Sequence, residues 1–131
     1  MSLTTLQPPG WARPRGYANG IAATGRMVFV AGQIGWNADC EFESDDLVAQ
    51  AAQALRNIVA VLAEAGALPA HIVRMTWYVT NRAEYIRRAK ELGAVYREII
   101  GGHYPAMTAV EVSALIEERA QVEIEVTAVM S

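Results

Sequence analysis

A glutamate near the C-terminus, Glu123, carries a carboxyl group that could take part in acid–base chemistry. It lies in residues 121–129, where apolar and polar side chains alternate as in a strand with one apolar and one mixed face. Residues 103–112 alternate in the same way and place Met107 on a mixed face. Residues 114–119 form a loop long enough for the two strands to pair. We therefore expect any site to lie on the mixed face that carries Met107 and Glu123.

Other kinds of chemistry have few candidate residues. The two histidines, His71 and His103, are far apart, and no cysteine cluster or His–Glu spacing typical of a metal site occurs. Neither Ser44 nor Ser113 has the context that activates a nucleophile. Cys40 lies in a polar loop, which is typical of a spectator. No phosphate loop or dinucleotide fingerprint is present, so the sequence predicts neither a metal nor a cofactor.

A long amphipathic helix is predicted in the first half of the chain. Residues 44–46 (Ser-Asp-Asp) supply a cap and acidic side chains for its first turn, and Gly66 ends it after about residue 65. Apolar residues recur at intervals of three and four, which gives one buried stripe, and Gln50 falls on the wetter side.

The remaining elements are strands and a second helix. Residues 17–22 and 27–31 flank Ala-Thr-Gly-Arg at 23–26, which is typical of a hairpin turn. Residues 72–80 form a third strand, and a helix capped by Asn81 runs to residue 100. The order β-β-α-β-α-β-β predicts an α+β fold, with one sheet and two helices packed on one face.

The face of the sheet without helices is expected to meet another molecule. Among its charges it carries residues too apolar for a patch in contact with water, namely Thr76, Tyr78, Ala109 and Thr127. We therefore expect an oligomer.

The length of 131 residues predicts a single domain over 1–131, with an extended Pro- and Gly-rich arm at 1–14. The net charge is −3 and no basic run occurs, which argues against a nucleic-acid partner. No apolar run is long enough for a membrane span, and no signal peptide is visible. Since a single cysteine suits a reducing compartment, we expect a soluble cytoplasmic protein.

Three motifs in order resemble a known family. Residues 104–112 (Tyr-Pro-Ala-Met-Thr-Ala-Val-Glu-Val) and 122–125 (Val-Glu-Ile-Glu) are similar to the C-terminal signature of the Rid proteins, reactive-intermediate deaminases also called the YjgF/YER057c/UK114 or endoribonuclease L-PSP family. Residues 28–34 (Val-Phe-Val-Ala-Gly-Gln-Ile) resemble the family's second strand, and residues 16–20 (Gly-Tyr-Ala-Asn-Gly) resemble its first. The resemblance implies a chorismate-mutase-like fold and a homotrimer with three sites in the clefts between subunits.

The resemblance also implies roles for single residues. Glu123 matches the glutamate that manages the water in deaminating members, and Tyr17 matches the tyrosine that lines the cleft. Gly32 and Gln33 match the segment that meets the ligand with backbone groups. Imine hydrolysis needs water at the C=N carbon and a proton at nitrogen, and a partly buried carboxyl group can serve both. From composition alone, a solvated glutamate and a strand-edge tyrosine are the simpler interpretations.

Met107 stands where the deaminating members carry arginine, and Gly93 stands where many carry asparagine. Losing a charged hydrogen bond to a substrate carboxylate costs about 1.5–3 kcal/mol, whereas a thioether suits an apolar part of a ligand. The resemblance therefore implies a divergent branch that acts on a different substrate.

Several further side chains could complete a pocket around Met107. A replacement cation could come from Arg13, Arg15 or Arg74, and Arg15 in particular could swing toward the cleft, although all three are also typical surface charges. Flat walls for an unsaturated ligand could come from Trp36, Trp77 and Tyr104, of which Trp77 also has the spacing of a core residue.

The leading hypothesis is a homotrimeric hydrolase that deaminates a reactive enamine or imine. In the second hypothesis the same clefts bind or sense a small molecule without turnover. A third, endoribonuclease activity, is disfavoured by the acidic charge and the lack of a basic, aromatic surface.

Overall fold

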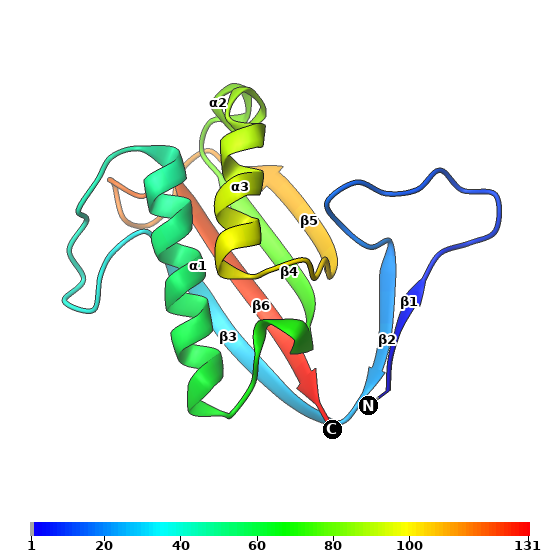
Figure 1. Ribbon diagram of the computed structural model, residues 1–131. Helices are drawn as coiled ribbons and strands as arrows, with labels where there is room; N and C mark the ends of the chain where they lie inside the picture. Colours follow the sequence, from blue (N-terminus) through cyan, green and yellow to red (C-terminus); the bar gives the residue numbers. More distant parts are fainter. Residues whose placement is uncertain (1) are drawn as a thin grey trace.

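The computed structural model describes residues 2–131 and contains a four-stranded sheet, a separate two-stranded ribbon, and helices on one side of the sheet (Figure 1). In chain order the elements are β1 (Ser2–Leu6), β2 (Gly20–Thr24), β3 (Arg26–Ile34), α1 (Leu47–Glu64), the 3₁₀ turn η1 (Pro69–His71), β4 (Ile72–Val79), α2 (Arg82–Arg87), α3 (Ala89–Ile99), β5 (Ala106–Glu111) and β6 (Val122–Met130).

The main sheet is mixed and has the strand order β3-β6-β4-β5. β6 is antiparallel to both β3 and β4, while β5 lies parallel to β4 at the edge. A parallel pair needs a crossover connection, which α2 and α3 supply. The predicted pairing of the strands that carry Met107 and Glu123 is therefore wrong, because β4 lies between β5 and β6. The predicted α+β class, with helices on one face, is confirmed (Figure 1).

Helix α1 begins and ends where the sequence predicts. The Asp46 carboxylate accepts a hydrogen bond from the Ala49 N–H at 3.0 Å, and Gly66 follows the helix with φ of 75°. Gln50, in contrast, is buried rather than on the wetter side. Its amide nitrogen donates to the Ser44 and Arg119 carbonyls at 3.0 and 2.9 Å. Its carbonyl accepts from the backbone N–H of Gln121 at 2.8 Å, so it ties the start of α1 to the start of β6.

The second predicted helix is two helices that meet at Arg88. Its guanidinium contacts Asp46 at 2.8 Å and Glu91 at 2.8 Å, which fixes the α2–α3 junction against the N-terminus of α1. The hydrogen bond from Arg88, and then the one from the Ala49 N–H, lower the pKa of Asp46. Asn81 caps α2 by accepting from the Glu84 N–H at 3.0 Å, as predicted.

The core fills the space between the sheet and helices α1 and α3. β6 sends alternate side chains into it, and β4 does so from Met75 onward, as their spacing predicts. A register shift after Ile72 places Ile72 in the core instead of Val73. The largest of the fully buried aliphatic residues are Leu55, Ile58, Leu62, Ile72, Met75 and Ile124.

The other face of the sheet is open to solvent in the single chain and is here called the bare face. Tyr78, Glu123, Glu125 and Thr127 lie on it, with Phe29 exposed at 70%. A shallow hollow on this face is lined by Phe29, Thr76 and Thr127, among others. Ala109 was predicted here, but it lies in register with Trp77, whose side chain faces the helices.

The N-terminal segment is placed differently from the prediction. The sequence predicts an extended arm at 1–14, yet Ser2–Leu6 forms β1, which pairs antiparallel with β2. The predicted hairpin between residues 17–22 and 27–31 is wrong, because β3 pairs with β6 and β2 pairs with β1. At Gly25 (φ 145°) the chain bends away, so the β1–β2 ribbon stands apart from the main sheet (Figure 1).

Candidate functional site

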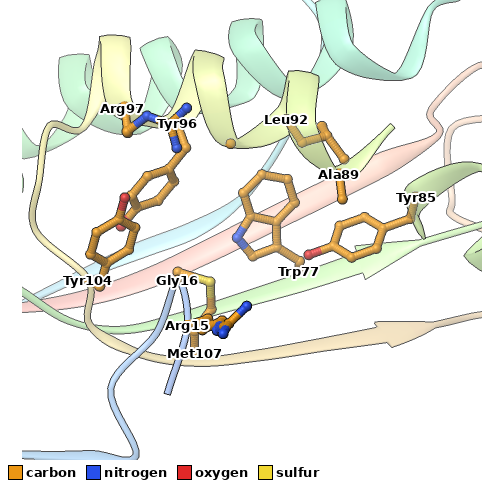
Figure 2. Close-up of a pocket in the computed structure, with 11 residues that line it drawn as sticks. Arg15, Gly16, Trp77, Tyr85, Ala89, Leu92, Tyr96, Arg97, Tyr104 and Met107 are labelled. Carbon is orange, nitrogen blue, oxygen red and sulfur yellow. The ribbon is translucent and has the colours of Figure 1, made fainter. Parts of the chain in front are cut away.

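A cavity of about 240 Å³ lies between helix α3 and the β4–β5 edge of the sheet, on the helix side. Figure 2 shows its lining side chains, which come from β4, α2, α3, β5 and the segments before β2 and β5. We call this cavity the aromatic pocket, because Trp77, Tyr85, Tyr96 and Tyr104 form most of its walls.

The aromatic side chains hold one another in place. The Tyr96 and Tyr104 rings stack with centroids 5.3 Å apart and planes 13° apart, and Trp77 meets Tyr85 edge-on at 6.1 Å. The Tyr96 hydroxyl donates to the His103 carbonyl at 2.6 Å, which fixes the loop that carries Tyr104. Burial raises the pKa of Tyr96 and of Tyr85, so both phenols stay neutral over the physiological range. The aromatic part of the pocket wall is therefore held in place and uncharged.

One polar group faces this pocket without a partner. The Trp77 side chain is 3% exposed, and its buried indole Nε1 has no hydrogen-bond partner in the described chain. Figure 2 shows this nitrogen on the side of the ring that faces Gly16 and Tyr104. A buried donor without an acceptor costs about 1–3 kcal/mol. A ligand with an acceptor atom at this point would remove that penalty.

Two arginines flank the same pocket. Arg15 lies beside Met107, and Arg97 lies on α3 near Tyr96 (Figure 2). Neither belongs to an ion pair found among residues 2–131. A Cβ built on Gly93 would lie 3.3 Å from Arg97 Nη1, so the missing side chain at 93 leaves room for the Arg97 guanidinium. The pocket that Met107 lines thus carries two cations from other positions, Arg15 beside Met107 and Arg97 across from it (Figure 2).

The predicted acid lies elsewhere, on the bare face. Glu123 stands opposite Tyr78 on β4 and Ile34 on β3. A Cβ at Gly32 would lie 2.0 Å from Glu123 Oε2, so the carboxylate rests directly against the Gly32 backbone. The Gln33 side chain donates to the Ala31 carbonyl at 3.1 Å.

A hydrogen-bonded pair adjoins Glu123. The Tyr78 hydroxyl donates to Glu125 Oε1 at 2.7 Å, and this bond raises the pKa of Tyr78. The bare face therefore gathers two carboxylates and a phenol that remains protonated.

Within one chain the two groups are on opposite sides of the sheet. Met107 lies in register with Met75, whose side chain is in the core, whereas the core neighbours of Glu123 are Val122 and Ile124. The prediction that Met107 and Glu123 share one mixed face is therefore wrong. The alternation along each strand was identified, but which faces coincide depends on strand order, and β4 intervenes.

Of the other residues predicted for the site, some line the aromatic pocket and some lie outside it. Arg15 and Tyr104 line the aromatic pocket. Tyr17, 42% exposed, lines an adjoining hollow that shares Gly16 and Tyr104 with it, and Arg13 lies there too. Trp36 contacts Phe42 at 5.9 Å and lies outside the aromatic pocket.

Sequence reasoning missed Arg97, Tyr85 and Tyr96 as pocket residues. Tyr85 and Tyr96 also pack against the core, as the apolar spacing of a second helix would suggest. A signal for Arg97 was available, because it follows Gly93 by four residues and so lies on the same face of α3.

No group of three or more His, Cys, Asp or Glu side chains in residues 2–131 is arranged to hold a metal ion. Nor does any helix in this described part have the length and apolar character needed to cross a membrane.

The chain is an α+β domain with a mixed sheet and an aromatic pocket beside its edge strand. Residues 11–130 match the family model described as endoribonuclease L-PSP. The chain belongs to this family, which is also the Rid or YjgF/YER057c/UK114 family.

Two curated relatives show the range of similarity. Protein DfrA of Myxococcus xanthus is 38% identical over 106 residues, covering 80% of this chain and 77% of DfrA. TdcF of Escherichia coli, described as a candidate reactive intermediate deaminase, is 30% identical over 132 residues, covering 98% and 96%.

Solved structures agree with the fold. The Rid-family protein YyfB of Yersinia pestis superposes with a TM-score of 0.87 at 32% identity, covering 99% of this chain and all of that one. Escherichia coli TdcF with bound serine superposes with a TM-score of 0.70 at 31% identity, covering 94% and 93%.

Proposed function

We propose that this protein hydrolyses a small enamine or imine that carries an anionic group beside a flat, unsaturated portion. One observation carries the proposal. The aromatic pocket holds an unpartnered buried N–H, from Trp77, between two arginines that lack an ion-pair partner in the described chain. The family supports the reaction type, since TdcF is described as a candidate reactive intermediate deaminase.

In this proposal the anionic group binds to Arg97 and Arg15 instead of to an arginine at position 107. A guanidinium can hold a carboxylate with two parallel hydrogen bonds. Arg97 extends over the space left by Gly93, and Arg15 approaches from the opposite wall (Figure 2). Met107 then contacts the apolar part of the substrate, and the unsaturated portion stacks on Tyr104.

The reaction consumes one water and releases one ammonia. An enamine first takes a proton on carbon and becomes an iminium ion, which is the protonated form of an imine. Water adds to the carbon of the C=N bond, a proton moves to nitrogen, and the C–N bond breaks. The products are a carbonyl compound and ammonia. Glu123 takes the proton from the attacking water and passes it to the leaving nitrogen, while Tyr17 and the backbone at Gly32 and Gln33 orient the reactants.

Because Glu123 lies across the sheet from the aromatic pocket, the acid of a complete site comes from a second copy. The bare face of one copy then closes the pocket of its neighbour. Three copies related by a closed rotation give three such sites, the homotrimer expected from the resemblance.

A matched panel of substrates tests the proposal. 2-Imino acids with aromatic and with small aliphatic side chains are released in situ by an amino-acid oxidase, together with imines that lack the carboxylate. We expect the protein to accelerate the decay of the aromatic 2-imino acid most and of the uncharged imine least. No acceleration of any member by the purified protein would refute the proposal.

Substitutions of Arg97 test whether this side chain binds the anionic group of the substrate. Arg97→Gln removes a charged hydrogen bond and should raise KM about ten- to a hundredfold, with partial rescue by Arg97→Lys. Arg87→Gln is the matched control, because Arg87 is exposed and pairs with Glu84 outside the pocket. RNA decay is measured in parallel, and cleavage abolished by Glu123→Gln, with every imine untouched, would replace this proposal with a ribonuclease.

A further inference from the structure

The unpaired strand edges of the described chain include the outer edge of β2, in the N-terminal ribbon, and the outer edge of β3, in the main sheet. β2 is paired along one edge only, with β1, and β3 is the outermost strand of the main sheet. Two-stranded ribbons are marginally stable alone, and an open strand edge readily pairs with another strand. On β3, Met27 and Phe29 are 56% and 70% exposed.

The sequence between these strands favours their pairing. Ala23-Thr24-Gly25-Arg26 has the composition of a four-residue hairpin loop. Closing that loop would pair Ala22 with Met27 and Gly20 with Phe29 in antiparallel register. The five residues of β2 could therefore pair in antiparallel direction along the first part of the nine-residue β3, although the two strands are not paired within this chain.

The opened state has its own support in the structure. At Gly25 the backbone has φ of 145°, and a Cβ there would lie 2.1 Å from the Met130 carbonyl oxygen. The far end of the ribbon is held at β5, where the Ala18 N–H donates to the Pro105 carbonyl at 2.9 Å and Ala18 bridges Ala106 in parallel. Gly25 and Ala18 thus fix the two ends of β2 away from its own β3.

We propose that the ribbon of one copy pairs with the β3 edge of a second copy, so that copies of this chain exchange their N-terminal strands. An exchanged element makes the contacts of the closed hairpin, but between chains. Each copy both gives a ribbon and receives one. The contact joins two different surfaces, the ribbon and the β3 edge, so it is heterologous and closes when the copies form a ring.

The exchange has a consequence for the candidate site. The same register that pairs Ala22 with Met27 brings Tyr17 opposite Gly32, and Gly32 carries the Glu123 carboxylate against it. Tyr17 precedes Ala18, which is fixed at the β5 edge beside Met107. The ribbon therefore connects the aromatic pocket of its own copy with the Glu123 face of the next. This inference concerns assembly and does not rest on the proposed reaction.

Cysteine pairs test the exchange directly. In a Cys40→Ser background, one tagged chain carries Ala22→Cys and an untagged chain carries Met27→Cys, and the two are coexpressed and mildly oxidised. Both positions are exposed, so the fold should tolerate them. We expect a disulfide-linked dimer of one tagged and one untagged chain on a non-reducing denaturing gel. Each chain expressed alone should give little of it.

The double variant Ala22→Cys/Met27→Cys separates the outcomes. Exchange predicts a ladder of covalent dimers and larger species. A chain that runs as a monomer and has lost both thiols would show that the hairpin closes within one chain, which would overturn the proposal. Retention of both thiols, with the protein folded and assembled by size-exclusion chromatography, would also overturn it.

Discussion

The two faces of the main sheet carry different kinds of side chain. The helix-covered face holds a closed core and, at its edge, a rigid aromatic pocket with cations and an unsatisfied N–H. The bare face holds carboxylates and an exposed phenylalanine, and in one chain nothing among the described residues covers it. In the proposed function, the groups that bind the substrate and the group that transfers the proton are thus separated by the thickness of the sheet. A second copy is the simplest means of joining them.

The largest effect should follow from the acid on the bare face. Glu123→Gln keeps the shape but cannot take a proton, so imine turnover should fall about 10²–10⁴-fold with unfolding unchanged. Glu118→Gln, in an exposed loop, is the control. If turnover survives in Glu123→Gln, the bare face takes no part in the chemistry and the comparison fails.

Substitutions in the core under the helix-covered face should lower stability rather than turnover. Leu55 is fully buried, and Leu55→Ala should lower the free energy of unfolding by about 2–5 kcal/mol, measured by urea denaturation. Val61→Ala, on the same helix but 40% exposed, should cost far less. Equal losses at the two positions would mean that α1 does not cover the sheet as described.

Adding one methyl group at each of two glycines compares the bare face with the helix-covered face. In Gly32→Ala the new Cβ would displace the Glu123 carboxylate, and a shift of about 1 Å can reduce a rate by about 10²-fold. In Gly93→Ala the Cβ meets only the end of the flexible Arg97 side chain, and the helix should gain about 0.5–1 kcal/mol of stability. Rate and denaturation measurements on both variants test this contrast, which fails if Gly93→Ala is the more damaging to turnover.

The smallest expected effect is the change of stability with pH that comes from Asp46, the N-cap residue of α1. The pKa of Asp46 is lowered in the folded protein, first by Arg88 and then by the Ala49 N–H, so the unfolded chain binds this proton more tightly. The stabilisation is complete above the ordinary carboxyl value of 3.8 and is lost as the pH falls through the lower folded value.

Two variants at position 46 separate charge from capping. Asp46→Ala should lose about 1 kcal/mol near neutral pH, measured by denaturation at several pH values. Asp46→Asn keeps a capping side chain and should flatten the dependence of stability on pH in the acidic range. If the stability of Asp46→Asn depended on pH as strongly as that of the wild type, another carboxyl group would be responsible for the effect.

The local pattern of the sequence was enough for most of the elements and for the class of fold, but not for β1 or for the division of the second helix at Arg88. Residues 44–46 and Gly66 delimit α1 because capping and left-handed backbone are properties of a few adjacent residues. Alternation identified β4 and β6, since each strand has one side against the core. Trp77, Arg15 and Tyr104 were also found among the candidates, but their meeting in one pocket was not.

Strand order, and with it the sides on which functional groups lie, was decided only in three dimensions. The spacing along one strand shows that successive side chains point to opposite faces. It does not show the order of the strands in the sheet. Because β4 lies between β5 and β6, Met107 and Glu123 are not on neighbouring strands. In the same way, the turn at 23–26 encodes a hairpin that the folded chain leaves open at Gly25, because contacts at Ala18 and Met130 outside the turn fix the ends of β2. Short-range preferences thus determined what each segment is, and long-range packing determined what each segment meets.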